Sequence, residues 1–273
     1  MHGILALGAS HLHSRTSLEL KDTVEKHRAM AMRGLLATTE TKNQLARQSR
    51  LNAQLGTAIA LSFTGACMGD SVTGLMILFR GVHSLLLDLQ RSGCASPFFL
   101  SEGRPATSEE LVAEVRPRLK NLPPLPCASE AERAMESLNF VGRTCSFEPK
   151  EWQFFLALKS IVANIDDPGE AYTHYNQLWA IFIGMSPDEF ARFSDPKNVT
   201  GIVLQAHFLV IEVMLRPWLL TLRLADRIDD FKATETLASL PPLGDKHSQQ
   251  LMQWPTRFIH EAHARKQSGH HLH

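Results

Sequence analysis

The sequence predicts an all-α fold in a single domain that covers residues 1–273. Apolar residues recur at helical spacing almost everywhere, and no alternating run bounded by turn residues suggests a strand. A chain of 273 residues with 44% hydrophobic composition is long enough to bury a sizeable core. The stretch from Val199 to Met214 is apolar on nearly every helical face, so we expect it to form the central helix of that core.

The first two helices are predicted near the start of the chain. The first covers about residues 3–13. Thr16 to Glu19 has the pattern of a capping box, in which the hydroxyl and the carboxylate satisfy backbone amides at a helix start. The second helix is therefore expected to begin there and to continue to about Leu35.

The third and fourth helices are predicted between residues 45 and 93. The third spans about residues 45–63, and the glycines of Gly65–Gly69 are expected to interrupt it. This segment also has the outline of a nucleophile elbow with cysteine in the serine position, but no βαβ organisation surrounds it, which favours a turn with a buried thiol. The fourth helix has an apolar stripe from Val72 to Leu86, begins at Ser71 or Asp70 and is closed by Gly93.

Proline and glycine divide the rest of the chain. An irregular excursion is expected over residues 94–128, with a short helix at 108–119 inside it. Asp195-Pro196 should stop the short helix that Pro187 opens, and Pro217 should kink or end the long apolar helix that follows. The tail at residues 268–273 is expected to fray. The remaining helices are predicted at about residues 129–142, 149–164, 168–184 and 254–266.

Charge and cysteine usage exclude some classes of protein. Lys plus Arg (28) balance Asp plus Glu (28), so the chain has no basic footprint for a phosphate backbone. Four separated cysteines form no CxxC pair and indicate neither a zinc cluster nor a disulfide framework. The apolar run Val199–Ile211 is too short and too polar for a membrane span. We expect an intracellular protein without membrane insertion.

No cofactor, metal site or catalytic residue is predicted. Asp166–Glu170 matches the DDxxE motif of magnesium-binding prenyl-diphosphate enzymes. The order of Asp167 as N-cap and Pro168 at the first helical position instead favours a helix start. His260–His263 has one residue too few between its histidines for the HExxH zinc motif.

Candidate binding residues come from the apolar helices. His207, on an otherwise apolar helix, is expected to be buried and to satisfy a backbone or carboxylate partner, with ligand contact as the second interpretation. Met and Phe side chains form a stripe that suits ordinary core or the wall of an adaptable pocket, and composition does not separate the two.

Several motifs, in order, resemble the regulatory domain of fungal zinc binuclear cluster transcription factors, in particular the sterol uptake control branch. They are the segment ILALGASHL from Ile4, the segment HRAMAMRGL from His27, LMILFRGV from Leu75, the segment from Met185 to Trp218, and Trp254-Pro255. Each motif consists largely of packing residues, so the resemblance depends on their order and spacing, which cover most of the chain.

The resemblance implies a helical bundle around an internal hydrophobic cavity that binds a sterol-like or secondary-metabolite molecule. It also implies control of transcription, with the protein in the nucleus and the cytoplasm. The residues expected to contact the ligand are Phe63, Met68, Phe79, Phe182, Met185, His207, Phe208, Ile211 and Met214.

The sequence departs from those factors because it contains no six-cysteine DNA-binding module. DNA binding would therefore require a module outside this sequence, and two interpretations stay open. The chain is either part of a longer factor or a free-standing relative. In the second case it is a co-regulator or a pocket enzyme, of the cyclase or isomerase type, that uses an acid/base group such as His207 or Asp70. Whether a homodimer forms is also left open.

Overall fold

The computed structural model describes residues 1–16, 18–37, 43–98, 108–119, 128–221 and 246–267, together with positions 122, 237, 240 and 244. Every regular element in these ranges is a helix, which confirms the all-α class. The chain divides into two compact units, the first containing α1 to α4 and the second α5 to α13. Each unit is described by itself, and a single domain over residues 1–273 stays a prediction.

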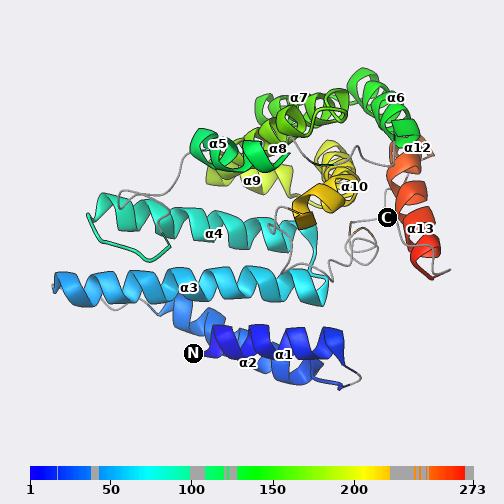
Figure 1. The fold of residues 1–273 in the computed structure, drawn as a ribbon. Coiled ribbons are helices and arrows are strands. Elements are labelled where there is room, and N and C mark those ends of the chain that lie inside the picture. The colour runs from blue at the N-terminus through cyan, green and yellow to red at the C-terminus, as the bar shows by residue number, and fades with distance from the viewer. Residues whose placement is uncertain are drawn as a thin grey trace. The chain divides into compact units, whose positions relative to one another are not determined.

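The first unit consists of a helical hairpin and two further helices. α3 packs along α4, and α1 and α2 pack against each other and against α3, as Figure 1 shows. Leu51, Leu55, Leu89 and Cys94 form a buried cluster between α3 and the end of α4. The bounds are α1 His2–Arg15, α2 Lys21–Leu36, α3 Gln44–Met68 and α4 Val72–Arg91.

Two sequence predictions for the first unit are wrong. α2 begins at Lys21, and the Thr16 hydroxyl instead donates to the carbonyl of Leu12 and accepts from the amide of Leu18. α3 does not stop before Gly65 but continues to Met68, and Gly69 ends it with a positive φ of 73°. A glycine inside a helix costs only about 1 kcal/mol, which the buried packing of these last turns offsets.

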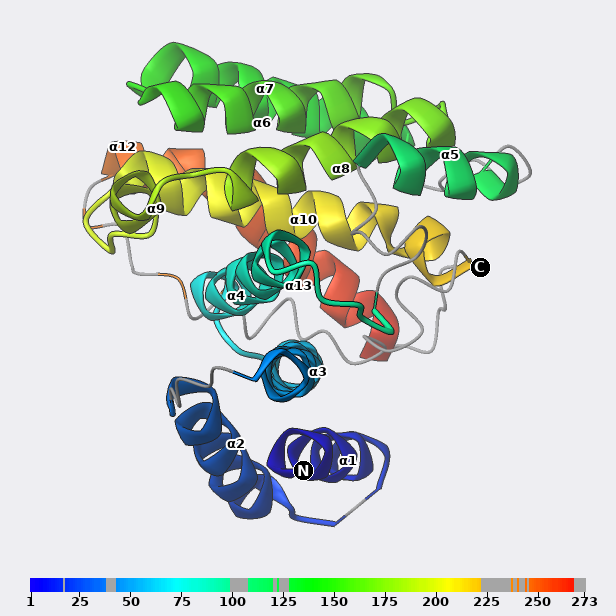
Figure 2. The same ribbon diagram turned by 90° about the vertical axis from the view of Figure 1, so that its left-hand side faces the viewer.

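The second unit is built around α10, as Figure 2 illustrates. α10 packs against α7, α9 and α13, α7 packs against α6 and α8, and α5 packs against α8. The bounds are α5 Ser108–Leu119, α6 Ala128–Thr144, α7 Pro149–Ala163, α8 Pro168–Ile183, α9 Pro187–Phe193, α10 Val199–Thr221, α12 Lys246–Leu251 and α13 Gln253–Gln267.

Most predicted helix starts in this unit are confirmed. Asp167 accepts hydrogen bonds from the amides of Gly169 and Glu170, so the acidic motif at this point is a helix cap. Ser186 and Glu189 form the capping box of α9. Pro217 does not end α10, which runs on to Thr221, and the short helix α12 was not predicted. The predicted frayed tail at residues 268–273 lies outside the described residues.

Among the helices that the structure describes, two have the length and apolar composition of a membrane span. They are α4 and the part of α10 that ends at Leu219, which is longer than the apolar run the sequence suggested. Within α10, 72% of the apolar window is buried, against 22% within α4. A buried core helix meets the same criteria, so they are weak evidence for a span. The absence of membrane insertion stays a prediction.

The junction between α9 and α10 depends on Gly201. A Cβ atom at this position would lie 2.2 Å from the backbone carbonyl oxygen of Phe193, which cannot rotate away. We expect Gly201→Ala to lower the free energy of unfolding by about 3 kcal/mol, the cost of forcing a packed backbone apart. Urea unfolding followed by circular dichroism measures this change.

Gly34→Ala in α2 is the matched control, because no described residue outside the helix's own backbone has an atom within 4 Å of a Cβ placed there. This variant should gain about 0.5 to 1 kcal/mol from helix propensity. Equal effects of the two substitutions would contradict the close packing at Gly201.

Candidate ligand-binding site

The nine residues predicted to contact a ligand divide between the two units. Phe63 and Met68 lie in α3 and Phe79 lies in α4, and all three side chains are half-buried. The six from the second unit, which are Phe182, Met185, His207, Phe208, Ile211 and Met214, are buried. Their common role as walls of one cavity stays a prediction.

Trp179 connects two of these predicted residues in the second unit. Its ring lies edge-on to Phe208 at 5.6 Å between centroids and to Phe182 at 5.7 Å. Phe208 also meets Phe154 at 6.1 Å. These spacings are those of favourable aromatic pairs, so Phe182 and Phe208 are core side chains that fix α8 against α10.

His207 is fully buried in the middle of α10 and forms two hydrogen bonds. Its Nδ1 lies 2.8 Å from the Val203 carbonyl oxygen, and its Nε2 lies 2.8 Å from the Ser137 hydroxyl in α6. Burial lowers the pKa of His207 to about 4, against the opposing effect of the Val203 carbonyl. The ring is therefore neutral near pH 7 and donates through Nδ1, while Nε2 accepts the Ser137 proton.

Ser137 also lines a pocket of about 390 Å³ between α6 and the pair α12 and α13. Trp254, which lines the pocket, packs its indole on the His207 ring at 5.4 Å between centroids. The Trp254 Nε1 atom is buried and has no hydrogen-bond partner among the described residues. The other lining residues are Arg133, Glu136, Ser137, Phe140, Gln250, Gln253 and Arg257.

Ion pairs neutralise both arginines of the pocket. Arg133 contacts the buried carboxylate of Glu130 at 2.6 Å. Arg257 lies 3.6 Å from Glu261 and 4.0 Å from the second oxygen of Glu130. Of this group, the sequence analysis selected only His207 as a candidate binding residue, and His207 contacts Ser137 and Trp254 of the pocket lining. The lining residues themselves come from helices that are far apart in the chain and share no motif.

α10 also carries a second ionisable residue, the half-buried Glu212. Glu212 accepts a hydrogen bond of 2.9 Å from the Tyr175 hydroxyl of α8. Burial raises the pKa of Glu212 to about 7, and the Tyr175 hydrogen bond and the charge of Arg216 oppose this shift. Burial also raises the pKa of Tyr175 well above its usual value. α10 therefore contains two ionisable groups, His207 and Glu212, whose pKa values are shifted in opposite directions.

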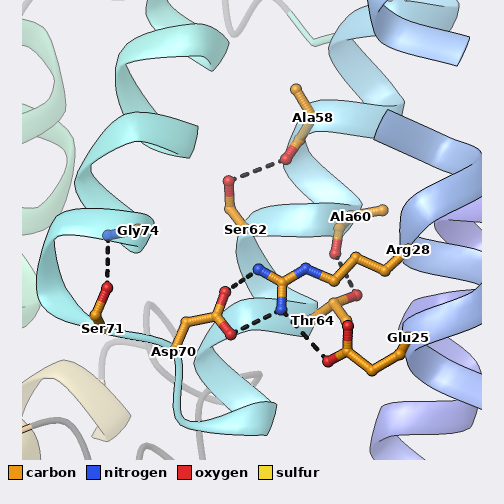
Figure 3. Close-up of polar contacts among 9 residues, drawn as sticks. All are labelled: Glu25, Arg28, Ala58, Ala60, Ser62, Thr64, Asp70, Ser71 and Gly74. Atoms are coloured by element: carbon orange, nitrogen blue, oxygen red, sulfur yellow. Dashed lines mark hydrogen bonds and ion pairs between the residues drawn. The ribbon is translucent and has the colours of Figure 1, made fainter. Parts of the chain in front are cut away.

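In the first unit, Arg28 and Asp70 form a bidentate ion pair, shown in Figure 3. The pair joins α2 to the turn between α3 and α4, and Glu25 lies 3.9 Å from the same guanidinium. A Cβ on Gly65 would approach the Asp70 carboxylate to 2.7 Å, so glycine leaves room for the pair. Asp70, considered as an acid/base group from the sequence, is held in this ion pair.

The described residues contain no cluster of side chains suited to bind a metal ion. Within them, no three His, Cys, Asp or Glu side chains are placed to hold an ion. Cys67 and Cys94 are buried free thiols, as expected for Cys67, and Cys145 is half-buried. Among the described residues, a pocket with the volume of a small molecule lies beside Ser137 and Trp254.

Residues 1–113 match the family described as the fungal specific transcription factor domain. This confirms the resemblance to fungal transcription factors, and it does not distinguish the sterol uptake control branch. No curated protein and no solved structure matches the chain.

Proposed function

We propose that the chain is the regulatory part of a fungal transcription factor and that it responds to a hydrophobic small molecule. The observation that carries the regulatory role is the match of residues 1–113 to the fungal specific transcription factor domain. Such a domain suggests function in the nucleus, and the cytoplasm is proposed as the second location. DNA contact would come from a separate module, in keeping with the balanced charge of this chain.

The pocket beside Ser137 is the proposed binding site. Its volume of about 390 Å³ falls in the range of small-molecule sites, roughly 300 to 1,000 Å³. Trp254 and Ser137 both border the pocket and both contact His207 in the centre of α10. A ligand that moves either side chain therefore acts on the most buried helix of the unit. A ligand shifts a protein between two states only if it binds them with unequal affinity. The contacts of Trp254 and Ser137 with His207 would link ligand binding to the position of α10.

A blocking substitution tests the site. Gln250 is exposed and lines the pocket, so Gln250→Trp should fill it without removing a buried hydrogen bond. We expect this variant of the full chain to lose at least about tenfold in affinity for whichever probe binds the wild type, because the occupied volume is lost. Native mass spectrometry with a sterol, a long-chain alcohol and a long-chain amine as probes measures the bound fraction.

Gln153→Trp is the control, because Gln153 is equally exposed but lies on α7 outside the pocket. It should bind as the wild type does. If Gln250→Trp bound every probe unchanged, the proposed site would be wrong. If no probe bound the wild type, ligand sensing itself would lose its support.

A pocket enzyme is the second candidate function, and one observation favours it. Ser137, His207 and the Val203 carbonyl are arranged as nucleophile, base and orienting acceptor, with 2.8 Å at each step. The lowered pKa of His207 opposes this function, since a base must take up a proton during catalysis. Mass spectrometry of the incubated probes separates the two functions, because an enzyme converts its ligand and a sensor releases it unchanged.

A further inference from the structure

The pocket proposed above has an unbalanced charge at one position. Arg133 lies against the carboxylate of Glu130, and Arg257 lies against those of Glu261 and Glu130. Glu136, which is exposed and lines the same pocket, forms no ion pair with any residue in the described part of the chain. The carboxylate that remains for a ligand is therefore that of Glu136, and it attracts a cation.

Ser137 adds a hydrogen-bond acceptor beside Glu136. Because the neutral His207 donates through Nδ1 to the Val203 carbonyl, its Nε2 must accept, and the Ser137 hydroxyl proton points to it. The hydroxyl oxygen then has only lone pairs to offer to the pocket. A ligand group that donates hydrogen bonds fits this position, and a group that only accepts does not.

Two aromatic side chains complete the lining. Trp254 is held in place by the rings of His207 at 5.4 Å and Phe258 at 6.0 Å, and Phe140 lines the pocket from α6. Aromatic faces attract cations, with tryptophan the strongest, and they also cover apolar ligand surface. Carboxylate, acceptor and aromatic faces together suit one class of ligand.

We propose that this pocket binds an amphipathic amine, a molecule with a protonated ammonium group on an apolar body. The ammonium lies between Glu136 and Ser137, and the apolar body packs on Trp254 and Phe140. This inference rests on the proposed function, since it names the ligand class of the same pocket. It replaces the purely hydrophobic ligand implied by the sequence with one that has a charged end.

A matched series of probes tests the ligand class on the full chain. Octylammonium, octanol and octanoate share one apolar tail and differ in the head group. We expect octylammonium to bind about tenfold more tightly than octanol, with octanoate the weakest, in isothermal titration calorimetry. Glu136→Gln should weaken octylammonium about tenfold and leave octanol unchanged.

Glu132→Gln is the control, because Glu132 is also exposed on α6 and does not line the pocket. It should bind octylammonium as the wild type does. Tighter binding of octanol or octanoate, or equal effects of the two glutamine variants, would overturn the amine while leaving the pocket in place as a binding site. Binding of none of the three probes would also contradict the amine as the ligand class. The separate blocking test with Gln250→Trp then decides whether the pocket is a binding site at all.

Discussion

Glu212→Gln is expected to make the free energy of unfolding rise by about 2 kcal/mol between pH 4.5 and pH 6.5, whereas that of the wild type stays nearly constant. Two ionisable groups on α10 cause the constancy, the buried His207 and the half-buried Glu212. The pKa of Glu212 is raised from 4.5 to about 7, and that of His207 is lowered from 6.5 to about 4. Their effects on stability oppose each other over this range.

The direction of each effect follows from where the protons bind. Above pH 4.5 the unfolded chain loses the Glu212 proton while the folded chain keeps it, so the contribution of Glu212 to stability is lost as the pH rises to about 7. Below pH 6.5 the unfolded chain protonates His207 while the folded chain does not, so stability is lost as the pH falls to about 4. Glutamine at position 212 leaves the histidine effect uncompensated.

Urea unfolding at several pH values between 4.5 and 6.5 measures these slopes. His207→Gln should show the opposite trend to Glu212→Gln, a fall of about 2 kcal/mol as the pH rises. Glu132→Gln, an exposed substitution on α6, should follow the wild type. A Glu212→Gln curve parallel to that of the wild type would show that Glu212 is not protonated in the folded chain at these pH values.

Asp70→Ala is expected to lower the free energy of unfolding by about 3 to 5 kcal/mol. Arg28 and Asp70 are only 15% and 16% exposed, so removing the carboxylate leaves a guanidinium with its charge uncompensated and largely out of water. The substitution also releases α2 from the turn between α3 and α4. Thermal and urea unfolding of the purified chain measure the loss.

Two comparisons separate the ion pair from general damage to the turn. Asp88 pairs with Arg91 at 3.8 Å on an exposed face of α4, and Asp88→Ala should cost at most about 1 kcal/mol. The double variant Arg28→Met with Asp70→Leu should recover much of the loss, because apolar residues of similar volume often replace a buried pair without cost. Equal losses for Asp70→Ala and Asp88→Ala would contradict the importance of the buried pair.

Sequence patterns predicted most of the helices because the interactions that start a helix join residues that are close together in the chain. Ser71 and Asp167 cap helices where the sequence placed them, since each hydroxyl or carboxylate bonds to amides two or three residues ahead. The errors came where tertiary packing overrode local preference. α3 runs through Gly65 because its last turns are buried, and α10 includes Pro217 inside a similarly buried segment.

The candidate site was less accessible from sequence. An ionisable residue in an apolar helix indicated that His207 is buried, and the structure places it at 0% exposure. Its partner Ser137 comes from a helix 70 residues earlier, a distance over which no periodicity gives information. The pocket also depends on α12, a helix of six residues that is too short to show a hydrophobic pattern.

The most direct test of the account measures transcription. The full chain is fused to an unrelated DNA-binding module, and reporter transcript is measured in cells with and without octylammonium. The wild-type fusion is predicted to change reporter output when the amine is added, and the Gln250→Trp fusion, expressed at the same level, is predicted to give one output under both conditions. Equal amine responses from the two fusions, or none from the wild type, would contradict regulation through this pocket.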